Sequence, residues 1–392
     1  MSKNKCRSPR KGFSDQLLWF LPMVVFTLLI AGCNQDNKPL RIGLIGTFSG
    51  KYADIGNDTL VGVRIAVNEI NDQGGINGRS VKLVIKDDRG SGEAAITAAR
   101  ELAAAGITTI IGPNLSTVAV KLVPWCTEQG ILLLTPTVST SQLAGIDDAM
   151  IRVFAHNRPD AGQVVADYIA QELEQQNGVI LYDAGNAAYT EDIVTYAERA
   201  MVAAGIKVKV VPFLTDKDFD YGATIDDILT QRHGFIYLVA AALDTAMFSW
   251  QVRKQQLPAQ LIFNHWAISD ELYRIGNEAV EGALFLSDHF PADKSAFPEF
   301  RRFRRQVAEQ TTRTSYKFMI YGYEASQVLF AGLRRSGDSL KQTILDLPSF
   351  SGLFYNFSID RFGDVKRPYF ATRIKNGAAV PFEVESSGRD ER

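Results

Sequence analysis

The alternation of short apolar runs with amphipathic segments is the feature that most constrains how this chain folds. The runs expected to form strands are residues 41–46, 81–85, 107–111, 131–134, 178–182, 206–213 and 235–239. The segments with helical spacing of apolar residues are 58–70, 93–105, 117–129, 159–174, 191–204, 221–231 and one that opens at Asp244. We expect Asp58 to cap the first helix. Short apolar strands separated by helices are typical of parallel sheets covered on both faces. Because the pattern runs through two successive series, the sequence predicts an α/β protein with two doubly wound, parallel-sheet lobes.

Length and charge narrow the choice of partners. The chain has 392 residues, which favours two domains over one. Its 42 basic and 44 acidic side chains give a net charge of −2. A protein that binds a phosphate backbone needs a concentrated basic field, so we expect no nucleic-acid partner.

The N-terminal segment is expected to lie outside the fold. Basic residues within 3–11 precede an apolar run over 17–30, which is short for a membrane span and typical of a signal peptide. The run ends in a segment, 29–33, that resembles a bacterial lipobox. The resemblance implies a signal peptide over 1–32, lipid on the Cys33 thiol and a lipidated tether over 33–39. The mature protein is then anchored in the bacterial cell envelope, facing the periplasm or the cell exterior. The alternative is an uncleaved N-terminal membrane anchor.

Cysteine usage agrees with this interpretation. Cys6 leaves with the signal peptide and Cys33 carries the lipid, so Cys126 stands alone and forms no internal disulfide. Because Cys126 lies on an apolar helix face, we expect a buried, inert thiol rather than a nucleophile.

Two turns that follow expected strands carry hydroxyl side chains. Ser116 and Thr117 come after the strand at 107–111, and Thr137 and Ser139 come after the strand at 131–134. In open α/β sheets, ligands bind at the carboxyl ends of the strands. A helix N-terminus there presents free N–H groups that suit a carboxylate. The two turns are therefore candidates for a carboxylate site, although hydroxyls at such turns also serve as ordinary helix caps.

A series of motifs in the first half of the chain resembles a known family. The motifs are residues 42–50, 62–71, 74–79, 83–88, 111–112 and 130–136. In this order and at this spacing they resemble the leucine/isoleucine/valine-binding family of periplasmic proteins, over about residues 40–380. The resemblance implies two lobes of the type I periplasmic binding protein fold, joined by three crossovers near His156, 287–291 and Lys366. It assigns residues 40–156 plus 290–365 to lobe 1, 157–289 plus 366–385 to lobe 2, and 386–392 to a tail.

The same resemblance implies ligand contacts. The family's hydroxyls on the ligand carboxylate and amino group correspond to Ser116 and Ser139, with Thr117 beside them and Thr137 offering its backbone carbonyl. An aromatic side chain from the second lobe corresponds to Tyr189, and one on a late helix corresponds to Phe318.

The amine end of the expected site departs from the family. Amino-acid binders of the family carry an acidic residue that pairs with the ligand ammonium, and Trp266 stands at that place here. An aromatic face holds an ammonium by cation–π attraction of about 0.5–2 kcal/mol, or it stacks on an aromatic or non-amino ligand. Alanines occupy 240–242 where a tyrosine is expected, and Ile55 replaces an aromatic residue.

Motifs of common enzymes are missing from the sequence. Residues 43–46 do not complete a dinucleotide-binding fingerprint, and 49–51 do not complete a P-loop. The histidines are scattered without metal-ligand spacing. We therefore expect no enzyme, no catalytic residue, no metal and no cofactor.

The function expected is capture of a small carboxylate-bearing ligand, an amino acid or a related compound, between two closing lobes, with delivery to an ABC importer in the membrane. The alternative is an outer-membrane lipoprotein that uses the same fold to regulate a partner, a cell-wall synthase or a sensor, without transport.

Overall fold

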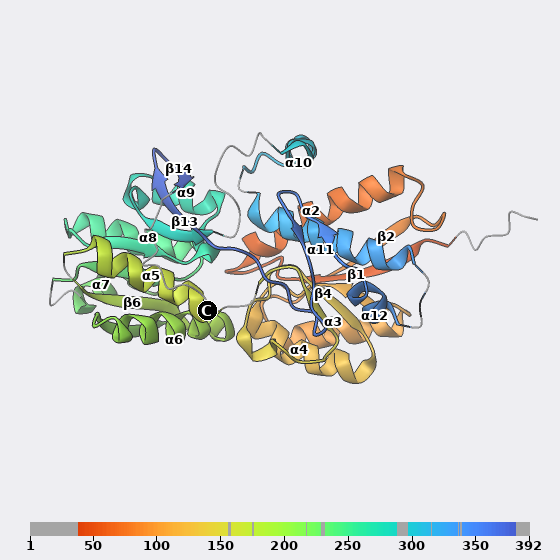
Figure 1. The fold of residues 1–392 in the computed structure, drawn as a ribbon, viewed down its shortest axis with the longest axis horizontal. Coiled ribbons are helices and arrows are strands. Elements are labelled where there is room, and N and C mark those ends of the chain that lie inside the picture. Colours follow the sequence, from red (N-terminus) through yellow and green to blue (C-terminus); the bar gives the residue numbers. More distant parts are fainter. Residues whose placement is uncertain are drawn as a thin grey trace, which may run out of the picture.

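The computed structural model of the chain describes residues 38–155, 158–174, 176–216, 218–228, 232–287, 297–314, 316–335, 337 and 339–381. The predicted signal peptide, the lipidation site Cys33, the first crossover at His156 and the predicted tail lie outside the described residues. Two lobes, each an α/β sheet with helices on both faces, lie side by side along the long axis of the molecule (Figure 1). The predicted fold class, two doubly wound lobes joined by three crossovers, is confirmed.

Lobe 1 is built on a parallel sheet with the strand order β2-β1-β3-β4-β5. Its strands are β1 (Leu40–Gly46), β2 (Val81–Asp87), β3 (Thr109–Ile111), β4 (Leu132–Thr135) and β5 (Met150–Arg152). The helices on its two faces are α2 (Ala53–Asp72) with α11 (Lys317–Leu333), and α3 (Gly92–Ala104) with α4 (Ser116–Gln129) (Figure 1). The smaller elements are η1 (Ser141–Leu143), α10 (Pro298–Gln310), α12 (Leu340–Leu345), β11 (Phe350–Ser351) and β12 (Asn356–Phe357). All residues of β4 are buried, because helices cover both faces of a parallel sheet.

Lobe 2 is built on a sheet with the order β14-β13-β10-β9-β8-β6-β7. The parallel strands are β6 (Asn177–Asp183), β7 (Lys207–Phe213), β8 (Phe235–Val239), β9 (Gln260–Phe263) and β10 (Leu284–Ser287). The helices are α5 (Pro159–Glu172), η2 (Ala184–Asn186), α6 (Ala187–Ala203), α7 (Tyr221–Ile228), α8 (Ala242–Lys254), η3 (His265–Ala267), α9 (Asp270–Gly276) and η4 (Asn277–Val280). The sequence analysis did not identify the last strands, β13 (Phe370–Lys375) and β14 (Ala378–Pro381), which add an antiparallel hairpin. Asn376 and Gly377 join them with positive φ angles of 54° and 69°, as a tight hairpin turn requires.

The prediction that Asp58 caps the first helix is wrong. Helix α2 begins at Ala53 without a side-chain cap, and Asp58 lies inside the helix, buried and in an ion pair with Arg313. Helix α6 also begins earlier than expected, at Ala187 rather than Glu191. The earlier starts extend the first turns of both helices toward the boundary between the lobes.

Helices α2 and α11 approach each other closely through two glycines. A Cβ atom at Gly62 would lie 1.8 Å from the carbonyl oxygen of Met319, and one at Gly322 would lie 2.3 Å from the carbonyl oxygen of Thr59. Any side chain at either position would push the helices apart. The two helices therefore form one rigid layer on lobe 1.

The chain passes between the lobes three times: between β5 and α5, between β10 and α10, and between β12 and β13. Arg367, on the third connection, is almost fully buried. Its Nε donates to the carbonyl of Val153, 2.6 Å away, and its Nη2 lies 2.7 Å from Oε2 of Glu324 on α11. One side chain therefore ties the third connection to the start of the first connection and to lobe 1. The lobe boundaries given above remain predictions.

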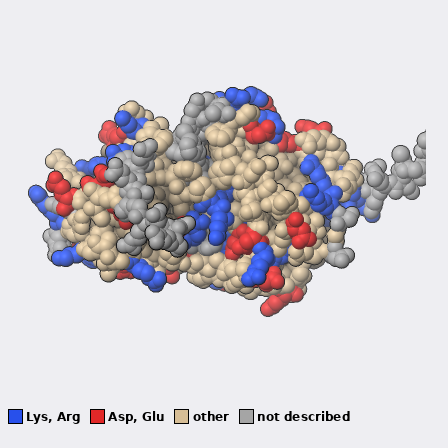
Figure 2. All heavy atoms as spheres, in the orientation of Figure 1, with Lys and Arg blue, Asp and Glu red and all other residues tan. Residues whose placement is uncertain are grey.

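The described surface carries charges of both signs. Figure 2 shows acidic and basic side chains interspersed over one face of the described residues. No helix in the described part of the chain is both long and apolar enough to cross a membrane. Cys126 is buried with a free thiol, and burial raises its pKa to about 12, so the thiol is unreactive at neutral pH.

Candidate ligand site

The first hydroxyl turn leads directly into helix α4. Gly112 has a φ of 110°, and a Cβ atom there would lie 1.8 Å from the carbonyl oxygen of Ile45, so only glycine fits the turn. Leu115 holds the N-cap position of α4 and supplies no side-chain cap. Of the first N–H groups of α4, that of Thr117 donates to Oδ1 of Asn186, and that of Ser116 is available to an acceptor from outside the helix.

The second hydroxyl turn is bonded to the first. The backbone N–H of Ser139 donates to Oγ of Ser116 over 3.2 Å, and Oγ of Thr137 donates to the carbonyl of Asn114 over 2.7 Å. Ser116 and Ser139 are buried, and Oγ of Ser139 has no hydrogen-bond partner. The prediction that the two turns lie together at the carboxyl ends of β3 and β4 matches this geometry.

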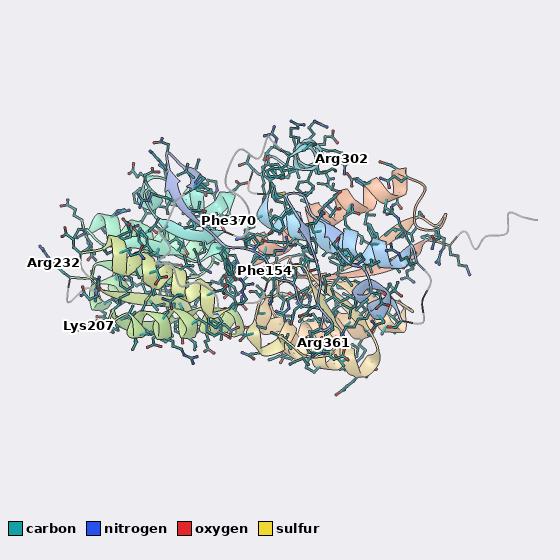
Figure 3. All side chains as sticks on the ribbon, in the orientation of Figure 1. Phe154, Lys207, Arg232, Arg302, Arg361 and Phe370 are labelled. Carbon is teal, nitrogen blue, oxygen red and sulfur yellow. The ribbon has the colours of Figure 1, made fainter. Side chains whose placement is uncertain are left out.

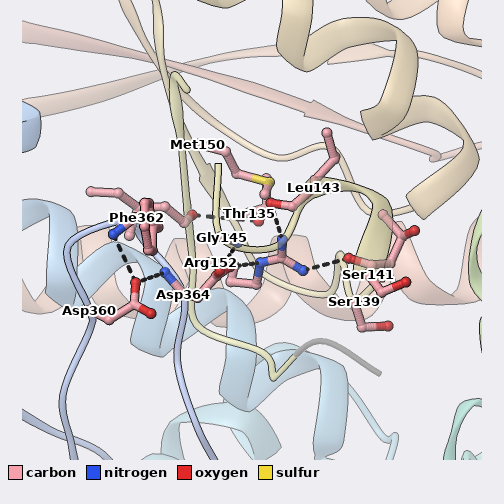
Figure 4. Close-up of polar contacts among 12 residues, drawn as sticks. Thr135, Ser139, Ser141, Leu143, Gly145, Met150, Arg152, Asp360, Phe362 and Asp364 are labelled. Carbon is pink, nitrogen blue, oxygen red and sulfur yellow. Dashed lines mark hydrogen bonds and ion pairs between the residues drawn. The ribbon is translucent and has the colours of Figure 1, made fainter. Parts of the chain in front are cut away.

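Arg152 holds the backbone that follows the second turn (Figure 4). Its fully buried guanidinium donates to the carbonyls of Thr140 and Leu143, at 3.0 and 2.8 Å, and pairs with Asp364 at 2.7 Å. Burial lowers the pKa of Arg152, and the carboxylate of Asp364 opposes that shift. The segment that follows Ser139 is thus held by a rigid, charged support.

A cavity with about 330 Å³ of atom-free space lies where these turns face lobe 2. Its walls are Ile55, Asn114, Leu115, Ser116, Thr137, Phe154, Asn186, Tyr189, His265, Trp266, Phe318 and Tyr321. Five residues predicted from the sequence are in this set: Ser116, Thr137, Tyr189, Trp266 and Phe318. Figure 3 shows Phe154 at the junction of the two lobes.

Two predicted residues, Thr117 and Ser139, are not among the cavity walls. The backbone N–H of Thr117 donates to Oδ1 of Asn186 over 3.1 Å, and its Oγ accepts the N–H of Ala188 over 3.2 Å. Thr117 therefore bonds the opposite lobe, and Ser139 supports the wall through Ser116.

Aromatic rings from both lobes form most of the cavity. Trp266 meets Tyr189 edge to face, with ring centres 5.3 Å apart, and Phe154 meets Tyr321 in the same way at 4.8 Å. The hydroxyl of Tyr189 accepts the amide of Asn264 over 3.0 Å, and burial raises the pKa of Tyr189. Nε1 of Trp266 is buried without a hydrogen-bond partner. The walls are thus mostly apolar, with a few polar groups directed by fixed elements.

Charged contacts close the boundary around this cavity. Lys51 of lobe 1 lies 2.9 Å from Oδ2 of Asp183 and 2.8 Å from Oδ2 of Asp244, both of lobe 2; we call these three residues the Lys51 latch. The hydroxyl of Tyr52 also donates to Asp183, over 2.9 Å, and burial next to that carboxylate raises the pKa of Tyr52. The lobes are therefore closed onto each other.

Several wall residues were not expected as ligand contacts: Asn114, Phe154, Asn186, His265 and Tyr321. Asn114 lies within the first turn, between β3 and Ser116, and was within reach of the sequence argument. Tyr321 lies in helix α11, which is apolar along most of its length, so the sequence predicted only core packing for it. Asn186 and His265 lie in short 3-10 turns, which leave no periodic pattern.

No group of three or more His, Cys, Asp or Glu residues among the described residues is arranged to hold a metal ion. Two α/β lobes on three connections, closed over a small buried cavity at the strand ends, define a two-lobed binding protein. A family model described as periplasmic binding protein matches residues 39–379. The chain belongs to this family.

Several proteins of known name resemble this chain in sequence or in structure. The Leu/Ile/Val-binding protein BraC3 of Rhizobium johnstonii is 26% identical over 76% of this chain and 80% of its own length. The leucine-binding protein LivK of Thermotoga maritima has a TM-score of 0.78 at 23% identity, covering 88% of this chain and 98% of that one. A solute-binding protein of R. palustris in complex with benzoate has a TM-score of 0.76 at 18% identity, covering 88% and 95%. These relatives are binding proteins and not enzymes, in line with the sequence analysis.

Proposed function

We propose that this protein is a lipid-anchored, extracytoplasmic solute-binding protein that captures a small carboxylate-bearing ligand between its lobes. The observation that carries the proposal is the cavity between the lobes whose wall includes Ser116, the first residue of α4. Free N–H groups and the positive end of the helix dipole favour an anion at that point. Little free space remains between the walls in the closed form, so the ligand is small.

The closed lobes then present a joint surface to an ABC importer, which takes the ligand through the membrane. Relatives named as amino-acid-binding proteins and as solute-binding proteins of ABC transporters support this part of the proposal. Closure follows ligand binding only if the ligand makes better contacts in the closed form than in the open form. The cavity has walls from both lobes, which supplies such contacts.

A thermal-shift screen of the protein without residues 1–33 tests solute capture. The panel contains the common amino acids, simple amides, urea and small aromatic acids. A ligand at about 100 times its Kd stabilises the folded state by about 2.7 kcal/mol, which gives a visible rise in Tm. If the folded protein shows no rise in Tm with any compound of the panel, the partner-regulating alternative is favoured. A pull-down with the lipidated protein then tests for such a partner.

The carboxylate role of Ser116 has its own test. Its Oγ accepts the N–H of Ser139, which leaves the hydroxyl proton free to donate into the cavity. Ser116→Ala should weaken binding of a carboxylate ligand by about 1–3 kcal/mol, measured by calorimetry. Ser326→Ala is the matched control, since Ser326 is equally buried but bonds the carbonyl of Gly322 within α11. Unchanged affinity in the Ser116 variant removes this hydroxyl from the site.

The lipid anchor is tested on the full chain. Cys33→Ser should abolish incorporation of a labelled fatty acid and release the protein from the membrane fraction, because several acyl chains are lost together. Retention of the variant in membranes favours the uncleaved N-terminal anchor.

A further inference from the structure

The described walls of the cavity contain no Asp, Glu, Lys or Arg side chain, and the imidazole of His265 is their one basic group. The acidic residues closest to it along the chain have other partners. Asp183 accepts Lys51 and Tyr52 on Oδ2 and the N–H of Gly185 on Oδ1. Asp192 accepts both the N–H and the hydroxyl of Ser141. The described site therefore offers no free carboxylate to a positively charged group of the ligand.

Asp54 is the remaining candidate for a counter-ion, since it precedes the wall residue Ile55. Asp54 lines a different cavity, at the rim of the lobe boundary, together with Asp58 and Arg313. Burial raises the pKa of Asp54 to about 6, so its carboxyl holds its charge less readily than an ordinary aspartate does. It is poorly suited to neutralise an ammonium inside the central cavity.

The cavity walls carry hydrogen-bond donors from both lobes, beside neutral acceptors such as the amide oxygen of Asn114. The N–H and the hydroxyl of Ser116, at the start of α4, lie on lobe 1, and the unpartnered Nε1 of Trp266 lies on lobe 2. An indole N–H donates and does not accept. A buried donor without a partner is costly, so a ligand acceptor opposite Nε1 of Trp266 would remove that cost. A carboxylate, with acceptors only, matches these donors, whereas an ammonium finds no carboxylate among the walls.

The rest of the wall matches a flat, apolar body. Phe154, Tyr189, Trp266, Phe318 and Tyr321 present rings from both lobes, several of them in edge-to-face pairs. Such pairs leave ring faces and edges to contact a further ring or a branched alkyl group. The cation–π attraction of Trp266 for an ammonium is too weak to replace the water that a buried ammonium loses.

We infer that the ligand is a small monocarboxylate with a flat or branched apolar body and no ammonium group, held at its carboxylate by α4 and contacted by Nε1 of Trp266. This inference rests on the proposed capture of a carboxylate ligand. It differs from that proposal in excluding amino acids as the preferred ligands.

Matched pairs of acids that differ only in the ammonium group give the test. Calorimetry on the protein without residues 1–33 compares 3-phenylpropionate with L-phenylalanine and 4-methylpentanoate with L-leucine, with benzoate as a fifth probe. We expect the member without the ammonium to bind at least tenfold more tightly in each pair. Tighter binding of L-leucine or L-phenylalanine would overturn the inference and leave the proposed solute capture intact. Binding of none of the five by folded protein would overturn the proposed capture, and the inference with it.

Two substitutions of Trp266 test separately the role of its indole N–H and the effect of the missing carboxylate. Trp266→Phe keeps a ring and removes Nε1, so it should weaken binding of the preferred acid about fivefold while the Tm of the free protein changes little. Trp266→Asp supplies a carboxylate and should shift the preference within each pair toward the amino acid by at least tenfold. Equal shifts for both members of a pair would mean that Trp266 only fills space.

Discussion

Removal of the Lys51 latch should uncouple the lobes while leaving each lobe folded. Lys51→Met keeps the length of the side chain and deletes its charge. Asp183 and Asp244 have exposed side-chain fractions of 0% and 1% in the closed form, so neither has water as a substitute partner. At an effective dielectric constant near 20, each contact corresponds to about 5–6 kcal/mol of Coulomb attraction. Desolvation of the three groups and repulsion between the two carboxylates offset most of this.

The net effect on closure is smaller because opening hydrates both carboxylates. Deleting one partner of a buried ion pair costs about 3–5 kcal/mol when no relief is available. Hydration relieves part of this cost, and the hydroxyls of Tyr52 and Tyr221 still donate to the carboxylates. We therefore expect the substitution to make lobe closure less favourable by about 2–3 kcal/mol. Affinity for the best acid of the matched pairs should then fall by about 30- to 150-fold, because each 1.4 kcal/mol is a factor of ten.

Calorimetry measures the affinity, and small-angle X-ray scattering measures the radius of gyration, which should rise in Lys51→Met without ligand. Lys121→Met is the control: it deletes a 2.7 Å ion pair with Glu93 whose partners are both exposed and both within lobe 1. Such exposed pairs contribute little, so the control should match the wild type. An affinity of Lys51→Met within twofold of the wild-type value, together with an unchanged radius of gyration, would refute the assignment of the latch to closure.

Three further predictions concern stability. Arg152→Met should lower the free energy of unfolding by about 3–5 kcal/mol in urea titrations, because it leaves Asp364 buried without its partner; a loss below about 1 kcal/mol would contradict this. Burial raises the pKa of Asp58 from 3.8 to about 7, so the folded state binds more protons than the unfolded state between these values and stability falls as pH rises through them. The free energy of unfolding should therefore be about 2 kcal/mol larger near pH 5.5 than near pH 8, with a correspondingly higher Tm. An equally steep dependence of Tm on pH in Asp58→Asn would exclude this residue as the cause. Gly62→Ala should lower Tm by several degrees, since its Cβ would meet the carbonyl of Met319 at 1.8 Å, and an unchanged Tm would show that α2 and α11 separate freely.

The fold was largely predictable because its central strands are apolar on both faces. Runs such as Leu132–Thr135 and Phe235–Val239 leave no alternative to a sheet covered by helices. The hairpin of β13 and β14 was missed because its strands lie at the edge and carry charged side chains, Arg373 and Lys375, among apolar ones. The start of α2 at Ala53 was missed because no capping side chain marks it, and the residue before it, Tyr52, bonds Asp183 of the other lobe.

The site was predictable where a turn or a motif marks it. Ser116 and Thr137 follow strands that the periodicity locates, and the family resemblance pointed to Tyr189 and Phe318. The structure places all four in the cavity walls, and their contact with ligand stays a prediction. Tyr321 was not predictable, because every turn of an apolar helix looks like core until the opposite lobe is in place.

Closure and selectivity are assigned to separate side chains in this molecule. Lys51, Asp183 and Asp244 draw the lobes together at the boundary, whereas Trp266 and Phe318 face the cavity from elements that the latch does not use. Substitutions in the cavity can therefore accumulate during evolution while the closing movement is retained. Under the proposed function, a change of nutrient needs only a few altered rings, and the closed shape presented to the importer stays the same.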